Sequence, residues 1–188
     1  MPQDMLVVGM PIDRNLTSLT RIQWKTHFSL WSISAAPLWI GVDMTSLPSG
    51  ALEILSNPGV VAVDQDPAGH AATCFSPGGC PHGNAVRYAE RSQSSTAAQV
   101  FARNLAPVPH TGKKRMAAVL FNPSELGPVA GHVDFNTLGF ETSVDVEYTD
   151  LWAPPAHAKY GLGKGHGKSY STAAIGPLDC VMLLLEEV

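Results

Sequence analysis

Long hydrophobic runs are missing from this sequence of 188 residues. The best candidate, residues 28–42, is interrupted by serines and a proline, so no segment reaches the roughly 18 apolar residues that cross a bilayer. Charged residues are also scarce, at 15%, whereas 45% of the residues are hydrophobic. This balance predicts a compact globular protein that buries a core, and it excludes a disordered chain. We expect no membrane partner.

Positive charge is sparse as well. The formal net charge is −4, and the lysines and arginines are scattered along the chain. The densest basic run, residues 113–115, follows Gly112 and is typical of a hairpin tip. Because no basic patch is available to neutralise phosphates, nucleic acid is excluded as an expected partner.

Only three cysteines occur. Cys74 and Cys80 bracket the turn FSPGG, which could bring two sulfurs together as a disulfide in an oxidising compartment. A zinc site is the alternative, but it would need further Cys or His ligands; His82 is nearby, but the sequence has no second C-x-x-C. Cys180 lies within the apolar run DCVMLLLE and is predicted to be buried.

The histidines are irregularly spaced, and none forms a helical H-x-x-x-H pair. His27 is predicted to be a packed or surface histidine on a helix rather than a ligand. Residues 161–168, GLGKGHGK, predict a flexible glycine-rich hairpin loop; a nucleotide-binding loop would need GKS or GKT between a strand and a helix. The sequence therefore predicts neither a metal site nor a cofactor.

Up to about Asp66, helical and strand-like segments alternate. Residues 19–36 predict an amphipathic helix with Ser18 or Thr20 as N-cap, ending before Pro37. The segment LWIGVDM, 38–44, predicts a buried parallel strand. A short helix is expected in SGALEILSN and an extended run in VVAVDQD. This alternation of helices and strands is typical of a barrel or a doubly wound sheet.

From about Gly69 onward, short strand-like runs are separated by Gly and Pro. In one of them Val144, Val146 and Tyr148 alternate with polar residues, as expected for one buried and one wet face. Several such strands predict an antiparallel β-sandwich. The expected strands are 85–90, 99–105, 116–122, 132–135, 143–152, 168–173 and 179–186.

Several ordered motifs resemble the melibiase-type α-galactosidases, the clan that also contains α-N-acetylgalactosaminidases. Asp4-Met5-Leu6 matches the end of the family's D-P-D-M-L loop, and LWSISAAPL at 30–38 matches the end of the following helix. The segment 64–69, DQDPAG, is similar to the N-Q-D-x-x-G motif at the family's domain boundary. YTDLW and GPLDCVMLLLE resemble the strands that close the family's sandwich.

The resemblance implies a fold class of α/β plus all-β. Residues 1–68 would be the last βα units of a (β/α)8 barrel, and residues 69–188 a C-terminal antiparallel β-sandwich. Because such a barrel takes about 250 residues, its first six strands are expected to be absent from this chain. The full-length family is secreted, vacuolar or lysosomal, and this compartment is implied here too.

The implied activity is retaining hydrolysis of terminal α-D-galactosyl residues by two carboxyl groups about 5 Å apart. In the family these groups follow barrel strands four and six, so no catalytic residue is assigned in this chain and the chain alone is expected to be inactive. Asp4 and Met5 match residues that line the galactose pocket, although Pro2-Gln3 replace the loop's first Asp-Pro. A solvated terminal residue is the alternative for Asp4.

Several other residues have competing interpretations. Asp43 either lies at the active-site face of a barrel or caps the turn near Ser46. Trp31 and Trp39 could stack on sugar, but their spacing favours core positions. Asn15 begins an N-x-T glycosylation sequence, usable in a secreted protein.

Two other functions compete with that of a hydrolase, namely a stand-alone β-sandwich that binds carbohydrate or protein, and a non-catalytic relic or subunit. For the completed enzyme the expected partners are α-galactoside sugars. We expect the sandwich to be the independently stable unit, and we expect apolar side chains of the first half to stay exposed and to promote homo-oligomers. Those side chains are Trp24, Phe28, Trp31, Ile33, Trp39 and Ile40.

Overall fold

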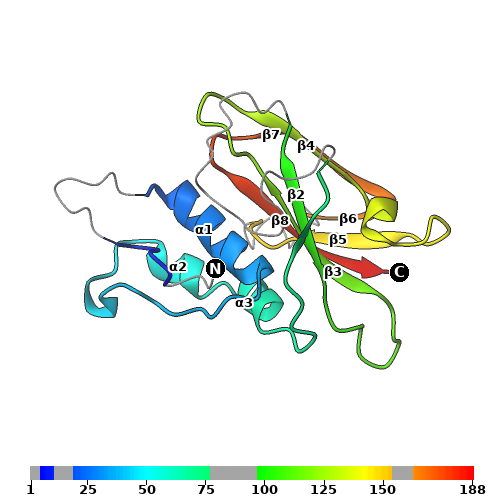
Figure 1. Ribbon diagram of the computed structural model, residues 1–188, viewed down its shortest axis with the longest axis horizontal. Helices are drawn as coiled ribbons and strands as arrows, with labels where there is room; N and C mark the ends of the chain where they lie inside the picture. Colours follow the sequence, from blue (N-terminus) through cyan, green and yellow to red (C-terminus); the bar gives the residue numbers. More distant parts are fainter. Residues whose placement is uncertain (1–4, 11–18, 77–96, 154–162) are drawn as a thin grey trace.

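The computed structural model describes residues 5–10, 19–76, 97–153 and 163–188. Three α-helices gather beside a large β-sheet (Figure 1). The helices are α1 (Arg21–Ile33), α2 (Ala51–Leu55) and α3 (Pro58–Asp64), with 3-10 turns η1 (Met44–Ser46) and η2 (Phe135–Leu138). The strands are β1 (Thr73–Cys74), β2 (Gln99–Asn104), β3 (Arg115–Phe121), β4 (Val129–Asp134), β5 (Val146–Asp150), β6 (Lys164–Gly167), β7 (Ser169–Ile175) and β8 (Cys180–Glu187).

The described strands form two antiparallel sheets. The larger has the order β1-β2-β3-β8-β5-β6, and the smaller pairs β4 with β7. The predicted antiparallel sandwich is therefore confirmed. The expected strand at 85–90 lies outside the described residues. Residues 164–167 were expected in a loop and instead form β6, which pairs with β5 and ends at Gly167.

Side chains of the central strands alternate between two cores. On β3, Met116, Ala118 and Leu120 pack in a cluster with buried side chains of β4, η2 and β7. Ala117 and Val119 point to the other face and join a second cluster, which contains the helices. Both faces of the larger sheet are thus covered, which explains why the segments MAAVLF and CVMLLL are continuously apolar.

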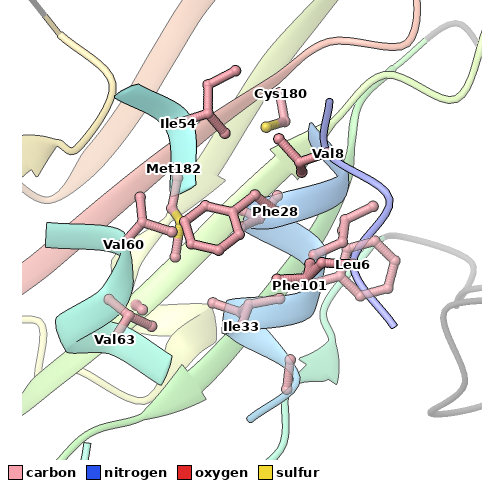
Figure 2. Close-up of a cluster of buried hydrophobic side chains, with 14 of the residues drawn as sticks. Leu6, Val8, Phe28, Ile33, Ile54, Val60, Val63, Phe101, Cys180 and Met182 are labelled. Atoms are coloured by element: carbon pink, nitrogen blue, oxygen red, sulfur yellow. The ribbon is translucent and has the colours of Figure 1, made fainter. Parts of the chain in front are cut away.

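The second cluster joins the first third of the chain to the sandwich. Figure 2 shows Phe28 and Ile33 of α1, Val60 of α3, Phe101 of β2 and Met182 of β8 in one group of buried side chains. We call this group the shared core. Separating the chain near residue 69 would expose the sheet's half of the shared core to water, which speaks against the expected independent stability of the sandwich.

The shared core corrects the expectation of an exposed apolar first half for Trp24, Phe28, Trp31 and Ile33, whereas Trp39 and Ile40 are exposed as that expectation had it. Phe28 and Ile33 are fully buried, and Trp24 and Trp31 pack against the shared core partly buried. The predicted core position of Trp31 is thereby confirmed. Trp39 was also predicted in the core, but its side chain is 68% exposed.

The start of α1 follows the sequence signal. The Thr20 side chain accepts a hydrogen bond from the Gln23 amide at 3.2 Å, and Gln23 accepts one from the Thr20 amide at 2.8 Å. This reciprocal pair is a capping box. The helix ends at Ile33, ahead of Ala35, whose φ of 51° cannot continue an α-helix.

The segment VVAVDQD was expected to be extended, and this prediction is wrong. Residues 58–64 form α3, because Asn57 caps the helix and Pro58 occupies its first turn. The Asn57 side-chain oxygen accepts hydrogen bonds from the Gly59 and Val60 amides at 3.0 and 3.2 Å. Its Nδ2 donates to the Leu151 carbonyl at 2.9 Å, so this residue also ties α3 to the end of β5.

Replacing Asn57 by alanine should lower the free energy of unfolding by about 1–2 kcal/mol, since both the cap and the link to Leu151 are lost. Asn57→Asp is the matched control, because it keeps the capping oxygen and removes only the donor. Urea denaturation of the variants measures both effects. An unchanged Asn57→Ala variant would mean that α3 contributes nothing to cooperative folding.

Candidate functional site

Two short segments run side by side and parallel next to α1. Leu6 and Ile40 form a parallel β-bridge. The Leu6 amide donates to the Trp39 carbonyl at 2.7 Å, and the Gly41 amide donates to the Leu6 carbonyl at 2.9 Å. We call residues 5–8 and 39–41 the edge pair. The predicted strand at 38–44 is thus reduced to one bridge, because no described segment pairs with its other side.

The edge pair has a buried and an exposed side. Leu6 and Val8 point into the shared core, as Figure 2 shows. Met5 and Ile40 are partly exposed on the outside. Gly41 allows the two segments to approach closely, since a Cβ there would lie 2.9 Å from the Met5 Cβ. Met5 is the one predicted pocket residue that the structure describes, and it lies at this surface.

His27 of α1 holds the edge pair from behind. Its Nε2 accepts a hydrogen bond from the Val7 amide at 3.2 Å, and its ring lies 4.1 Å from that of Trp31. The side chain is 5% exposed, and burial lowers its pKa to about 4. His27 is therefore neutral near pH 7, with its proton on Nδ1. The prediction of a packed histidine is confirmed.

Asp43 follows the edge pair and caps η1. Its carboxylate accepts hydrogen bonds from the Thr45 hydroxyl at 2.7 Å, the Thr45 amide at 2.8 Å and the Ser46 hydroxyl at 3.2 Å. The Thr45 hydroxyl is the main cause that lowers the pKa of Asp43. The capping interpretation is confirmed, and the carboxylate is already engaged within its own turn.

The DQDPAG motif forms a joint between the helices and β2. The Asp66 carboxylate accepts hydrogen bonds from the Ala68 and Ala106 amides at 3.0 and 2.8 Å. Arg103 of β2 is 2% exposed and donates from Nη1 to the Ser32 carbonyl at 3.2 Å. Burial raises the pKa of Asp64, and the positive charge of Arg103 opposes this shift.

Arg103 was not singled out from the sequence. The signal that could have found it is a lone arginine inside the strand-like segment QVFARN, where the neighbouring residues are mostly apolar. A buried guanidinium needs nearby carboxylates, and Asp64 and Asp66 provide the negative charge. This joint fixes α3 against the sheet.

The remaining predicted site residues are only partly described. Asp4, Asn15 and Cys80 lie outside the described residues. Cys180 is free and buried, and burial raises the pKa of its thiol. The pairing of Cys74 with Cys80 stays a prediction.

A separate cavity of about 240 Å³ lies on the sandwich. Its lining includes the buried residues Phe135, Phe140 and Val146 together with several polar residues. The polar lining residues include Asp134, Asn136, Glu141, Thr142 and Lys168.

The described residues contain no group of three or more His, Cys, Asp or Glu side chains placed to hold a metal ion. No helix within the described ranges is long and apolar enough to span a membrane.

This chain is similar to known α-galactosidases. Residues 95–185 match the family of the α-galactosidase C-terminal β-sandwich domain. An α-galactosidase of Oryza sativa subsp. japonica is 30% identical over 183 residues, which are 97% of this chain and 34% of the relative. Alpha-galactosidase 2 of Arabidopsis thaliana is 28% identical over 97% of this chain and 37% of its own length. The chain thus spans little more than a third of these curated relatives.

Solved structures agree with this fold. Alpha-galactosidase I from Mortierella vinacea superposes with a TM-score of 0.69 at 18% identity, covering 97% of this chain and 38% of that one. The Saccharomyces cerevisiae α-galactosidase solved with raffinose gives 0.69 at 17% identity, over 98% of this chain and 46% of that one. A β-L-arabinopyranosidase from Geobacillus stearothermophilus gives 0.65 at 20% identity, over 98% of this chain and 36% of that one.

The chain resembles the C-terminal portion of the melibiase-type α-galactosidases over nearly its whole length, and its residues 95–185 match their C-terminal β-sandwich domain.

Proposed function

We propose that this chain is the C-terminal part of an α-galactosidase that removes terminal α-D-galactosyl residues with retention. Residues 1–68 would complete a (β/α)8 barrel, and residues 69–188 would support it. The observation that carries the proposal is the parallel edge pair joined through α1. Parallel neighbours need a crossover connection, and a helix between two parallel strands is the repeating unit of this barrel.

The edge pair would form one wall of the sugar pocket. Asp4 directly precedes Met5, whose side chain is partly exposed beside Gly41. In the melibiase-type α-galactosidases, which this chain resembles, the Asp and Met that match Asp4 and Met5 line the galactose site. Asp4 would accept hydrogen bonds from sugar hydroxyls, and Met5 would provide an apolar contact.

The chemistry would come from other residues than these. A retaining mechanism needs a nucleophilic carboxylate at the anomeric carbon and a second carboxyl group that protonates the leaving oxygen. Among the described acids, Asp43 is committed to its turn and Asp66 to the Ala68 and Ala106 amides. The family's two catalytic aspartates have no match in this sequence, so we propose that the chain alone lacks activity.

The test is release of nitrophenol from a nitrophenyl α-galactoside. The 188-residue chain should give a rate at background, because positioned carboxyl groups supply many kcal/mol of barrier lowering. A fusion that adds the missing barrel strands of the Oryza sativa relative should hydrolyse the substrate. In this fusion Asp4→Asn should reduce the rate strongly, and Asp43→Asn should not. Turnover by the chain alone that is lost in Asp4→Asn would contradict the assignment.

A secreted, vacuolar or lysosomal compartment is proposed from the same resemblance. Glycosylation of Asn15 and a Cys74–Cys80 disulfide both fit an oxidising compartment. Alkylation of the denatured chain before and after reduction tests the disulfide: one reactive thiol before reduction and three after it are expected, and three before reduction would refute it.

A stand-alone sugar-binding sandwich is the second candidate, favoured by the cavity near Phe135. The cavity lining includes the carboxylates of Asp134 and Glu141 as acceptors. It also includes Asn136 and Thr142, which can donate and accept, and Lys168, which can donate. Neutral polyhydroxylated ligands match such a mixture. Titration with galactose, followed by amide shifts, should perturb η2 if this candidate is correct and leave it unperturbed otherwise.

A further inference from the structure

We propose that His27 is a positioning residue for the edge pair, acting through a neutral Nδ1–H ring whose Nε2 accepts the Val7 amide. Its effect on a galactose pocket rests on the proposed function, because that function places Asp4 and Met5 in the pocket. The hydrogen bond itself and its test do not depend on that function.

The backbone of the edge pair explains why a side chain is needed there. Along an extended segment, successive amides point to opposite sides. The Leu6 amide and carbonyl both bind the 39–41 segment, so the Val7 amide faces the other way. A buried amide without an acceptor costs about 1–3 kcal/mol. His27 provides that acceptor from α1, where another strand would otherwise be required.

The position of His27 makes this contact rigid. The ring is buried and packs on Trp31 of the same helix. Leu6 and Val8, the neighbours of Val7, are anchored in the shared core. The segment carrying Met5 is therefore fixed by three successive residues, of which Val7 is the one held by a hydrogen bond to a side chain.

The contact depends on the protonation state of His27. A proton on Nε2 would turn the acceptor into a donor that faces the Val7 amide, and the hydrogen bond would be lost. Burial is the cause that lowers the pKa of His27 to about 4.

The charged groups on the elements around α1 have other partners. Glu53 of α2 pairs with Arg21 at 2.5 Å, and Asp179 before β8 pairs with Lys25 at 2.5 Å. Asp64 of α3 and Arg103 of β2 act on each other. The Val7 contact should consequently persist through mildly acidic pH and fail near pH 4.

The test is nuclear magnetic resonance of the chain labelled with ¹⁵N at histidine and valine. The His27 ring should show the Nδ1–H tautomer at pH 7, and the Val7 amide shift should follow the His27 titration near pH 4. In His27→Leu, exchange of the Val7 amide should accelerate roughly tenfold, the upper range for one net hydrogen bond. His27→Gln should rescue protection without the pH dependence, since its side-chain oxygen can accept.

His132→Gln is the matched control, because His132 is exposed on β4 and contacts Ser171 instead. It should leave the Val7 amide unchanged. An Nε2–H tautomer, or a Val7 shift that ignores the His27 titration, would overturn the proposal even if the leucine variant failed to fold. An inactive barrel fusion with an intact Val7 titration would refute the proposed function and leave the role of His27 standing.

Discussion

Replacing Ile33 by alanine is expected to lower the free energy of unfolding by about 2–5 kcal/mol. Ile33 lies at the end of α1 with 0% exposure, inside the shared core. Truncation removes buried methyl and methylene groups and leaves a cavity between the helix and the sheet. Urea denaturation followed by tryptophan fluorescence measures the change.

Ile22→Ala is the matched control for this prediction. Ile22 lies on the same helix but is 49% exposed, so its truncation should change stability by no more than about 0.5 kcal/mol. Equal effects of the two substitutions would mean that α1 does not dock on the sandwich as described.

Acidification from about pH 6.5 to about pH 4 is expected to cost roughly 3 kcal/mol of stability through His27 alone. The unfolded chain has the ordinary histidine pKa of 6.5, and burial lowers the folded value to about 4. Between these values the unfolded state binds more protons than the folded state. Stability from the neutral ring is therefore complete above pH 6.5, falls as the pH drops, and is lost below about pH 4.

Comparison with His27→Gln isolates this contribution. Asp64 and Asp150 have pKa values raised by burial, which favours the folded state on acidification and so acts in the opposite sense. Both carboxyl groups are present in either protein, and their effects cancel in the difference. Relative to His27→Gln, the unmodified chain should lose roughly 3 kcal/mol of unfolding free energy between pH 7 and pH 4; a difference that stays constant with pH would contradict the buried neutral histidine.

Much of the sandwich could be predicted because its strands carry local signals. β2, β3, β5, β7 and β8 each coincide with an expected apolar run. The uninterrupted apolar sequences of β3 and β8 also indicate that both faces of the sheet are covered. The identity of the covering helices depends on contacts far apart in the chain, which local patterns do not contain.

The errors in the first third of the chain have separate causes. The helix expected in SGALEILSN ends at Asn57 and an extended run was expected after it, although an N-cap residue followed by proline equally begins a helix. Residues 38–44 have the composition of a buried strand, but a strand also needs partners, and among the described residues Ile40 bridges only Leu6. Trp39 is consequently exposed.

The candidate site was predictable only in part. Motif resemblance identified Met5 and the DQDPAG segment, because their residue types and order carry the signal. The acceptor role of His27 and the burial of Arg103 arise from packing between elements distant in sequence. A histidine on an amphipathic helix can be packed in the core, exposed on the surface or a ligand, and the sequence alone does not select one of these roles.

Native-state hydrogen exchange tests the central claim, that the helices and the sandwich fold as one unit around the shared core. Amides of Phe28 and Leu30 in α1 should exchange with the same free energy and the same urea dependence as those of Val119 in β3 and Leu183 in β8. The claim would be contradicted if the α1 amides exchanged through an opening of lower free energy while the sheet amides stayed protected.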